Sequence, residues 1–254
     1  PENRKNEMAF STRIYADYGM EKKTGTDKYH SLGTILELPD GREFKYAKAG
    51  AVALGQGKIV AAAAPTGHHD MDLVTAAAAV GATSITVTLE GTAAAEDLYA
   101  DGYIFTNDDT GEGQVYRIAG HDAIASSGSG AIDLAENDKV AVALTSSTLS
   151  GLAPNPYNGV VISPTTVVNR TVGVPTTAIA ASAYGWIQTK GLASILVSGT
   201  VVLGEPLRVA GATTAGAVMA LNRDGTDENE QEVGVVMGVV SVTTDYALVF
   251  LNID

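Results

Sequence analysis

The chain contains no cysteine, a single tryptophan and few aromatic residues, which make up 6% of its 254 residues. The lack of cysteine excludes disulfides and thiolate metal sites, and it leaves the redox compartment open. The low aromatic content argues against a carbohydrate-binding cleft. Apolar residues are mainly alanine, valine, leucine and isoleucine, and glycine and threonine are frequent. This composition favours packed β-sheet with tight turns over helical bundles.

Basic residues are also scarce, with 16 Lys and Arg against 29 Asp and Glu and a net charge of −13. Residues 1–50 hold nine basic and eight acidic residues, which gives +1, whereas the rest holds seven and 21, and 7 − 21 = −14. An acidic body argues against nucleic-acid binding, because a protein must neutralise phosphates to bind them. The charge-dense N-terminal part is therefore where we expect a partner contact.

Long apolar runs are missing as well. The longest stretch of small apolar residues, 59–64, ends at Pro65, and no run approaches the ~20 residues of a membrane-spanning helix. The first residues are charged and lack the apolar core of a signal peptide. We therefore expect a protein that is made in the cytoplasm, stays soluble and has no membrane partner.

Short β-branched runs alternate with glycine-containing turns, most clearly in residues 184–254. This pattern predicts a small barrel or sandwich. Further strands are expected at 85–89 and on both sides of two turns, Pro39-Asp40-Gly41 and residues 107–113. Residues 93–101, which end at Gly102, form the one plausible helix.

The predicted fold class is therefore all-β: two small barrel or sandwich modules, an extended N-terminal arm and very little helix. The arm covers residues 1–31, and it either orders against another copy or a different protein or is partly disordered. An N-terminal β module with hairpins covers 32–155, and a C-terminal barrel or sandwich module covers 156–254. Breaker residues between 150 and 165 place the boundary there.

Three polar stretches are candidates for metal binding. His68, His69, Asp70 and Asp72 favour a polar surface loop, with a weak metal site as the alternative, because neighbouring residues on a strand face opposite sides. Residues 107–112 fail the EF-hand spacing and predict a hairpin turn. Residues 224–232 carry five acids and predict an outward loop, with calcium or a basic partner as alternatives.

No catalytic set is recognisable around the four histidines, His30, His68, His69 and His121. Paired carboxylates remain open in so acidic a chain, since their separation cannot be read from a sequence. The expectation is a protein that is not an enzyme and that has no catalytic residue, no bound metal and no cofactor. A hydrolase is the less favoured alternative.

Three segments, taken in order, carry a resemblance. They are residues 40–50 (DGREFKYAKAG), residues 102–104 with 110–118 (GYI and TGEGQVYRI), and residues 185–191 with 202–207 (GWIQTKG and VLGEPL) together with the final Gly-Val-Val strands. Together they resemble the head decoration, or capsid cement, proteins of tailed bacteriophages. The resemblance implies a virion structural protein that binds the outside of an icosahedral capsid, commonly as a homotrimer that clamps neighbouring major capsid subunits.

The partners expected from this resemblance are the major capsid protein and further copies of the chain, with no nucleic acid and no membrane. We expect the arm and the first hairpin to face the capsid through their basic residues, which are Arg4, Lys5, Arg13, Lys22, Lys23, Arg42 and Lys45. Trp186 is expected to anchor a core or a subunit interface and not to serve as a ligand platform. A phage tail or receptor-binding protein is the structural alternative.

Overall fold

A computed structural model describes residues 12–165, 170–210, 214–222, 230–238 and 244–253. In these ranges the structure is built of β-strands and one short 3-10 helix, η1 (Met20–Lys22), so the predicted all-β fold class is confirmed. Within the same ranges, no helix is long and apolar enough to span a bilayer.

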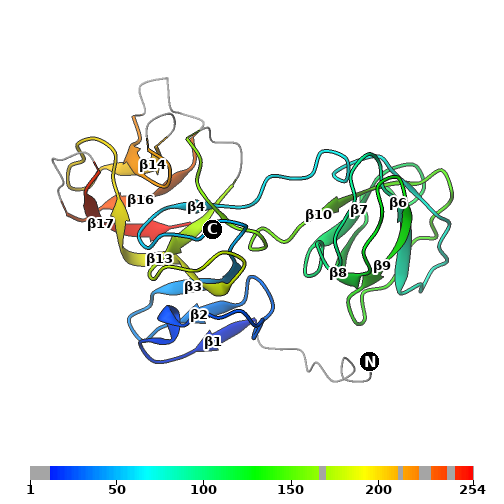
Figure 1. Cartoon of the computed structure of the whole chain (residues 1–254), viewed down its shortest axis with the longest axis horizontal. Helices are drawn as coiled ribbons and strands as arrows, with labels where there is room; N and C mark the ends of the chain where they lie inside the picture. The colour runs from blue at the N-terminus through cyan, green and yellow to red at the C-terminus, as the bar shows by residue number, and fades with distance from the viewer. Residues whose placement is uncertain (1–11, 166–169, 211–213, 223–229, 239–243, 254) are drawn as a thin grey trace. The chain divides into compact units, whose positions relative to one another are not determined.

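The chain divides into two units (Figure 1). Unit 1 combines residues 1–63 with 156–254, and unit 2 is residues 64–155. The division expected at 155/156 is one of the two junctions. The other differs from the expectation, because residues 32–63 belong with the C-terminal part and not with residues 64–155. The reason is strand pairing, since residues 43–48 pair with residues 184–190.

Unit 2 is a six-stranded barrel. Its strands are β5 (Leu73–Thr75), β6 (Ser84–Thr88), β7 (Tyr103–Asp108), β8 (Val115–His121), β9 (Ser129–Leu134) and β10 (Leu149–Ala153). They close in the order β10-β5-β6-β9-β8-β7. Side chains along β6 alternate between the inside and the outside of the barrel. Ile85 and Val87 are fully buried, whereas Ser84, Thr86 and Thr88 lie on the outer face.

Two local predictions in unit 2 have different outcomes. The predicted strand–turn–strand at 103–118 is confirmed as the β7–β8 hairpin. The predicted helix at 93–101 is wrong, and the segment consists of turns with a bridge from Ala94 to Ile124. Asp97 and Asp101 have φ of 57° and 62°. Aspartate tolerates this left-handed conformation in turns, but such residues cannot continue an α-helix.

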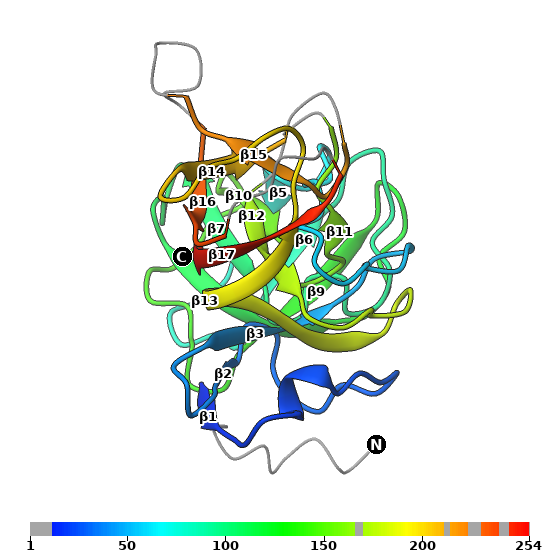
Figure 2. The ribbon, with the colours of Figure 1, turned by 90° about the vertical axis from the view of Figure 1, so that its left-hand side faces the viewer.

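Unit 1 is built on an 11-stranded sheet. Its strands are β1 (Arg13–Tyr15), β2 (Ile35–Glu37), β3 (Glu43–Lys48), β4 (Val60–Ala61), β11 (Val161–Ile162), β12 (Thr171–Pro175), β13 (Tyr184–Leu196), β14 (Pro206–Val209), β15 (Val218–Ala220), β16 (Glu232–Val236) and β17 (Tyr246–Asn252). The main order is β1-β2-β3-β13-β17-β16-β14-β15, and β4, β11 and β12 pair off this path. Figure 2 shows β13 and β17 crossing the middle of this unit.

The long strand β13 joins two cores. Its first half pairs with β3 and its second half with β17. In the second half, Ala193 and Ile195 enter a core of aliphatic side chains that also contains Val249 and Leu251 of β17. In the first half, Trp186 is 2% exposed and packs in an aromatic and aliphatic cluster with Phe44 and other buried residues. This second cluster lies beneath the N-terminal segment.

Candidate partner-contact surface

The N-terminal segment, residues 12–31, is part of unit 1 and not a separate arm. Strand β1 pairs in parallel with β2, and Gly25 and Tyr184 exchange backbone hydrogen bonds of 3.1 and 2.8 Å. The expected extended arm of 1–31 is therefore wrong for its second part, because that part finds sheet partners in the same chain. Arg4 and Lys5 lie outside the described residues.

Arg13 is committed to acidic neighbours within unit 1. Its guanidinium forms an ion pair with Glu37 across the β1–β2 pair and lies 3.5 Å from a carboxylate oxygen of Glu43 on β3. The hydrogen bond to Glu37 is the main reason that the pKa of Arg13 is raised. Glu43 also pairs with Lys190 of β13 at 3.3 Å. These ion pairs connect four adjacent strands, β1, β2, β3 and β13. Carboxylates of the same chain therefore balance much of the positive charge of Arg13.

Two further expected contact residues lie on the β2–β3 hairpin. The Nε of Arg42 is 2.7 Å from a carboxylate oxygen of Asp40, and its guanidinium lies 5.8 Å from the centre of the Phe44 ring. The ammonium of Lys45 lies 6.0 Å from the centre of the Tyr157 ring. Both side chains are partly buried and held against their own unit. They support the hairpin as much as they offer charge to a partner.

Lys22 and Lys23 are the most accessible of the expected cations that the structure describes. Both are exposed and sit at the end of η1. The turn that carries them is fixed from below by Glu21, which is only 2% exposed and whose carboxylate accepts a hydrogen bond of 2.5 Å from the Gly19 N–H. This hydrogen-bonded turn therefore presents two adjacent positive charges to solvent.

Three tyrosines of the same segment are exposed, and none of them is among the contact residues predicted from the sequence. Tyr15, Tyr18 and Tyr29 are 74%, 61% and 69% exposed. They are three of only ten tyrosines in the chain. Tyrosine is enriched in protein interfaces and among the residues that dominate binding energy. The signal in the sequence was the unusual density of tyrosine in residues 15–29, which lack an apolar periodicity to bury it.

The tyrosine-bearing segment is anchored on the core by His30. The imidazole of His30 lies 5.1 Å from the ring of Tyr46, edge-on, and 5.4 Å from the indole of Trp186. Burial lowers the pKa of His30 below its ordinary value of 6.5. This half-buried ring packs against both aromatic side chains and holds the segment on them.

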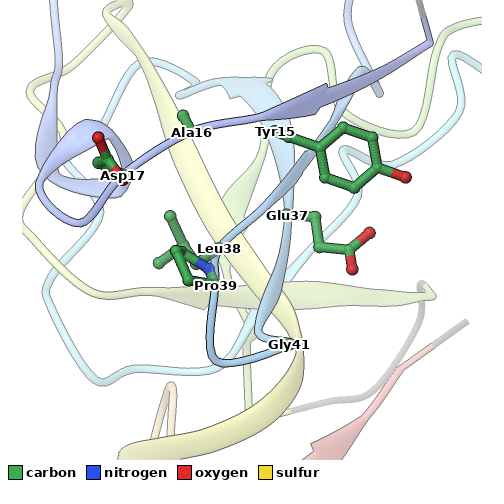
Figure 3. Close-up of a pocket in the computed structure, with 7 residues that line it drawn as sticks. All are labelled: Tyr15, Ala16, Asp17, Glu37, Leu38, Pro39 and Gly41. Carbon is green, nitrogen blue, oxygen red and sulfur yellow. The ribbon is translucent and has the colours of Figure 1, made fainter.

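A shallow hollow of about 440 Å³ lies at the end of β1, between it and the turn of the β2–β3 hairpin (Figure 3). Tyr15 and Asp17 stand at its two ends, with Leu38 and Pro39 between them. Its lining residues are Tyr15, Ala16, Asp17, Glu37, Leu38, Pro39 and Gly41. The hollow combines an aromatic ring, an apolar floor and two carboxylates, of which that of Glu37 is paired with Arg13. We call the three exposed tyrosines, Lys22, Lys23 and this hollow the N-terminal surface.

The polar loop predicted around residues 68–72 is only partly correct. His68 is exposed, but His69 is completely buried in unit 2. The Nδ1 of His69 lies 2.6 Å from the Tyr99 hydroxyl and its Nε2 lies 2.8 Å from the Thr92 carbonyl. His121 accepts the Tyr99 N–H through Nε2 at 3.1 Å. The two histidines thus satisfy buried polar groups of the barrel.

Groups of three or more His, Asp or Glu side chains that could hold a metal ion do not occur in the described part of the chain. Most of the acidic stretch 224–232 lies outside the described residues. Comparisons with protein-family models, with curated proteins and with solved structures found no match.

Proposed function

We propose that this chain is a structural protein of a phage virion, which binds the outer face of an icosahedral capsid and stabilises it by contacting neighbouring major capsid subunits. The observation that supports this most is the N-terminal surface. Exposed Tyr15, Tyr18 and Tyr29 flank the exposed cations Lys22 and Lys23 on one segment held by sheet pairing and by His30. Aromatic and cationic side chains on a fixed scaffold are what a protein partner recognises.

The charge distribution agrees with this proposal. The chain carries 7 − 21 = −14 outside residues 1–50, so most of its surface repels packaged DNA and other anions. Lys22 and Lys23 supply local positive charge where a capsid subunit would meet the protein. The major capsid protein would therefore contribute apolar pockets for tyrosines and acidic groups for the lysines.

The stabilising effect follows from linkage. A ligand that binds the assembled lattice but not separated subunits stabilises the lattice by RT ln(1 + [L]/Kd), which is about 2.7 kcal/mol per site at a hundredfold excess over Kd. An oligomer that engages several subunits at once gains further through avidity. We propose that the chain acts as such an oligomer, a homotrimer in the simplest arrangement, without chemistry of its own.

The direct test is co-sedimentation of purified protein with capsids of the source phage that were assembled without this chain. We expect saturable binding to the wild type and at least tenfold weaker binding for the triple variant Tyr15→Ser, Tyr18→Ser, Tyr29→Ser. Point substitutions are preferable to deleting residues 12–31, because the deletion would also remove β1 and uncover Trp186.

A matched control is Tyr103→Ser, which changes an exposed tyrosine of unit 2 that is 39% exposed. It should bind like the wild type. Absence of wild-type binding would contradict the capsid proposal as a whole. Equal binding by the wild type and the triple variant would keep a capsid protein but remove the N-terminal surface as its anchor.

A further inference from the structure

Part of one face of the unit 1 sheet carries exposed apolar side chains. On the outer side of β13, β17 and the end of β16, Leu192, Met237, Tyr246, Leu248 and Phe250 are each between 45% and 49% exposed. The alternate residues of β17, Ala247, Val249 and Leu251, are buried in the core on the opposite side. Both faces of this strand are therefore apolar, although only one meets the core of the unit.

The five residues form one continuous patch, which we call the β17 face. Phe250 is the register partner of both Leu192 on β13 and Val235 on β16. Leu248 accepts the N–H of Met237 through its carbonyl at 2.8 Å and pairs with Ser194. Strand β17 lies between β13 and β16 (Figure 2). The patch thus sits on central strands of the sheet, which hold its shape.

A strand face that only meets water is usually polar, not apolar. Strand β6 of unit 2 carries Ser84, Thr86 and Thr88 on its outer side, which is the usual polar pattern of a sheet with one solvated face. The β17 face instead exposes roughly 400 Å² of apolar surface, the size of the largest apolar patch on a typical monomer, which is often functional. Two such faces with their rims would bury about 1,000 Å², the lower limit for a specific interface.

We propose that the β17 face is where a second copy of this chain docks. The patch and its ladder partners Ser194 and Val235 contain no charged side chain, whereas the chain as a whole carries −13. Like-charged copies repel, and that cost is lowest where an uncharged apolar face makes the contact. The nearest exposed cation on the same side of β13 is Lys190, which is already paired with Glu43 at 3.3 Å. An identical face offers the same apolar chemistry as the patch itself.

This inference rests on the self-association in the proposed function: face-to-face contact of two β17 faces gives a dimer, and a trimer brings three of them together around its axis. It is tested without capsids, so the two proposals can fail separately. The measurement is the molar mass of purified protein by light scattering after size exclusion, from about 1 to 100 µM. We expect an oligomer for the wild type, and a monomer for Leu248→Glu and for Phe250→Glu. The matched control is Val115→Glu, which adds the same charge at an exposed valine of β8 that is 59% exposed, and it should stay oligomeric.

A second readout does not depend on a charge in the sheet. Because the chain has no cysteine, Leu248→Cys and Val115→Cys each carry a single thiol. We expect maleimide to label Leu248→Cys at least tenfold more slowly than Val115→Cys at concentrations that give the oligomer, and equally fast after dilution to the monomer. Higher salt should leave the association intact or strengthen it, since it screens the repulsion between copies.

Three results would overturn the proposal. The first is a wild-type monomer at 100 µM with freely labelled Leu248→Cys, which would leave the face for a different protein. The second is a monomer in which Leu248→Cys stays protected, which would mean that the same chain covers the face. The third is an oligomer that survives both glutamate substitutions, which would place the contact elsewhere.

Discussion

The ring of Tyr46 lies 5.0 Å from the indole of Trp186, and the two residues are direct register partners on β3 and β13. This pair joins the β2–β3 hairpin to β13, the longest strand among the described residues, across a sequence separation of 186 − 46 = 140 residues. The rings of His30 and Tyr184 add to it on either side. The cluster therefore couples the core of unit 1 to the segment that carries the N-terminal surface.

Replacing Trp186 by alanine should lower the free energy of unfolding of unit 1 by about 3–5 kcal/mol, because a fully packed aromatic side chain is lost and a cavity remains. Urea unfolding followed by far-UV circular dichroism at fixed protein concentration measures this. Tyr15→Ala removes an aromatic ring that is 74% exposed and should change stability by no more than about 0.5 kcal/mol. Equal stability of both variants would mean that Trp186 does not hold this core.

Acid should weaken unit 1 through His30. Its pKa is lowered by burial, so the unfolded chain takes up the proton first as the pH falls below about 6.5. The stability contributed by the neutral imidazole is therefore present above pH 6.5 and is lost as the pH falls through the folded-state pKa. The fluorescence of Trp186, the only tryptophan, reports unfolding of this cluster.

The control for this experiment is His30→Phe, which keeps an aromatic ring but does not titrate. We expect the urea midpoint of the wild type to fall more between pH 8 and pH 5 than that of the variant, since carboxylates affect both equally. Identical pH profiles for the two proteins would show that His30 is not the acid-sensitive group.

Hairpins were predictable from the sequence because their determinants are local. Pro39-Asp40-Gly41 lies between alternating residues, and Gly41 has a φ of 80°, as the turn requires. The pairing of β3 with β13 was not predictable, because nothing near residues 43–48 indicates which distant strand completes their sheet. For the same reason the sequence predicts a separate arm for residues 1–31, although β2 and Tyr184 supply partners for its second part.

The site was predictable only in part. Local charge density pointed to the N-terminal region, but it could not show that Arg13 and Arg42 are occupied by Glu37 and Asp40. The buried state of His69 depends on Tyr99, 30 residues away. Such contacts are decided by tertiary packing, which overrides the polar character of a stretch.

Alkaline conditions should weaken unit 2 through Tyr99. Burial raises the pKa of Tyr99 to about 12. The unfolded chain releases this proton near pH 10, so the stability of the barrel is unaffected below pH 10 and is lost as the pH rises from 10 to 12. Scanning calorimetry of the full chain between pH 8 and 11.5 should show one transition moving to lower temperature above pH 10.

Tyr99→Phe separates this effect from general alkaline damage. At pH 8 the variant should be less stable by about 1–3 kcal/mol, because Nδ1 of buried His69 loses its partner. Its further loss above pH 10 should be smaller than in the wild type. Tyr103→Phe, at an exposed position of the same barrel, should behave like the wild type. A steep alkaline loss in Tyr99→Phe would contradict the assignment.

The backbone of unit 2 passes close to Gly102, the residue before β7. A Cβ there would collide with the carbonyl oxygen of Ala153 on β10 and lie 2.9 Å from the carbonyl oxygen of Tyr99. Both obstacles are backbone atoms, so no side-chain rotation relieves them, and the N–H of Gly102 already donates to the Tyr99 carbonyl at 2.9 Å. Gly102→Ala should therefore destabilise the barrel by about 1–3 kcal/mol.

Gly67→Ala is the matched control, because no atom lies within 4 Å of its Cβ position. This variant should be as stable as the wild type or more stable by up to about 1 kcal/mol. Calorimetry measures the transition temperature of both variants. An unchanged transition temperature for Gly102→Ala would mean that β7 and β10 are not packed this closely at the start of β7.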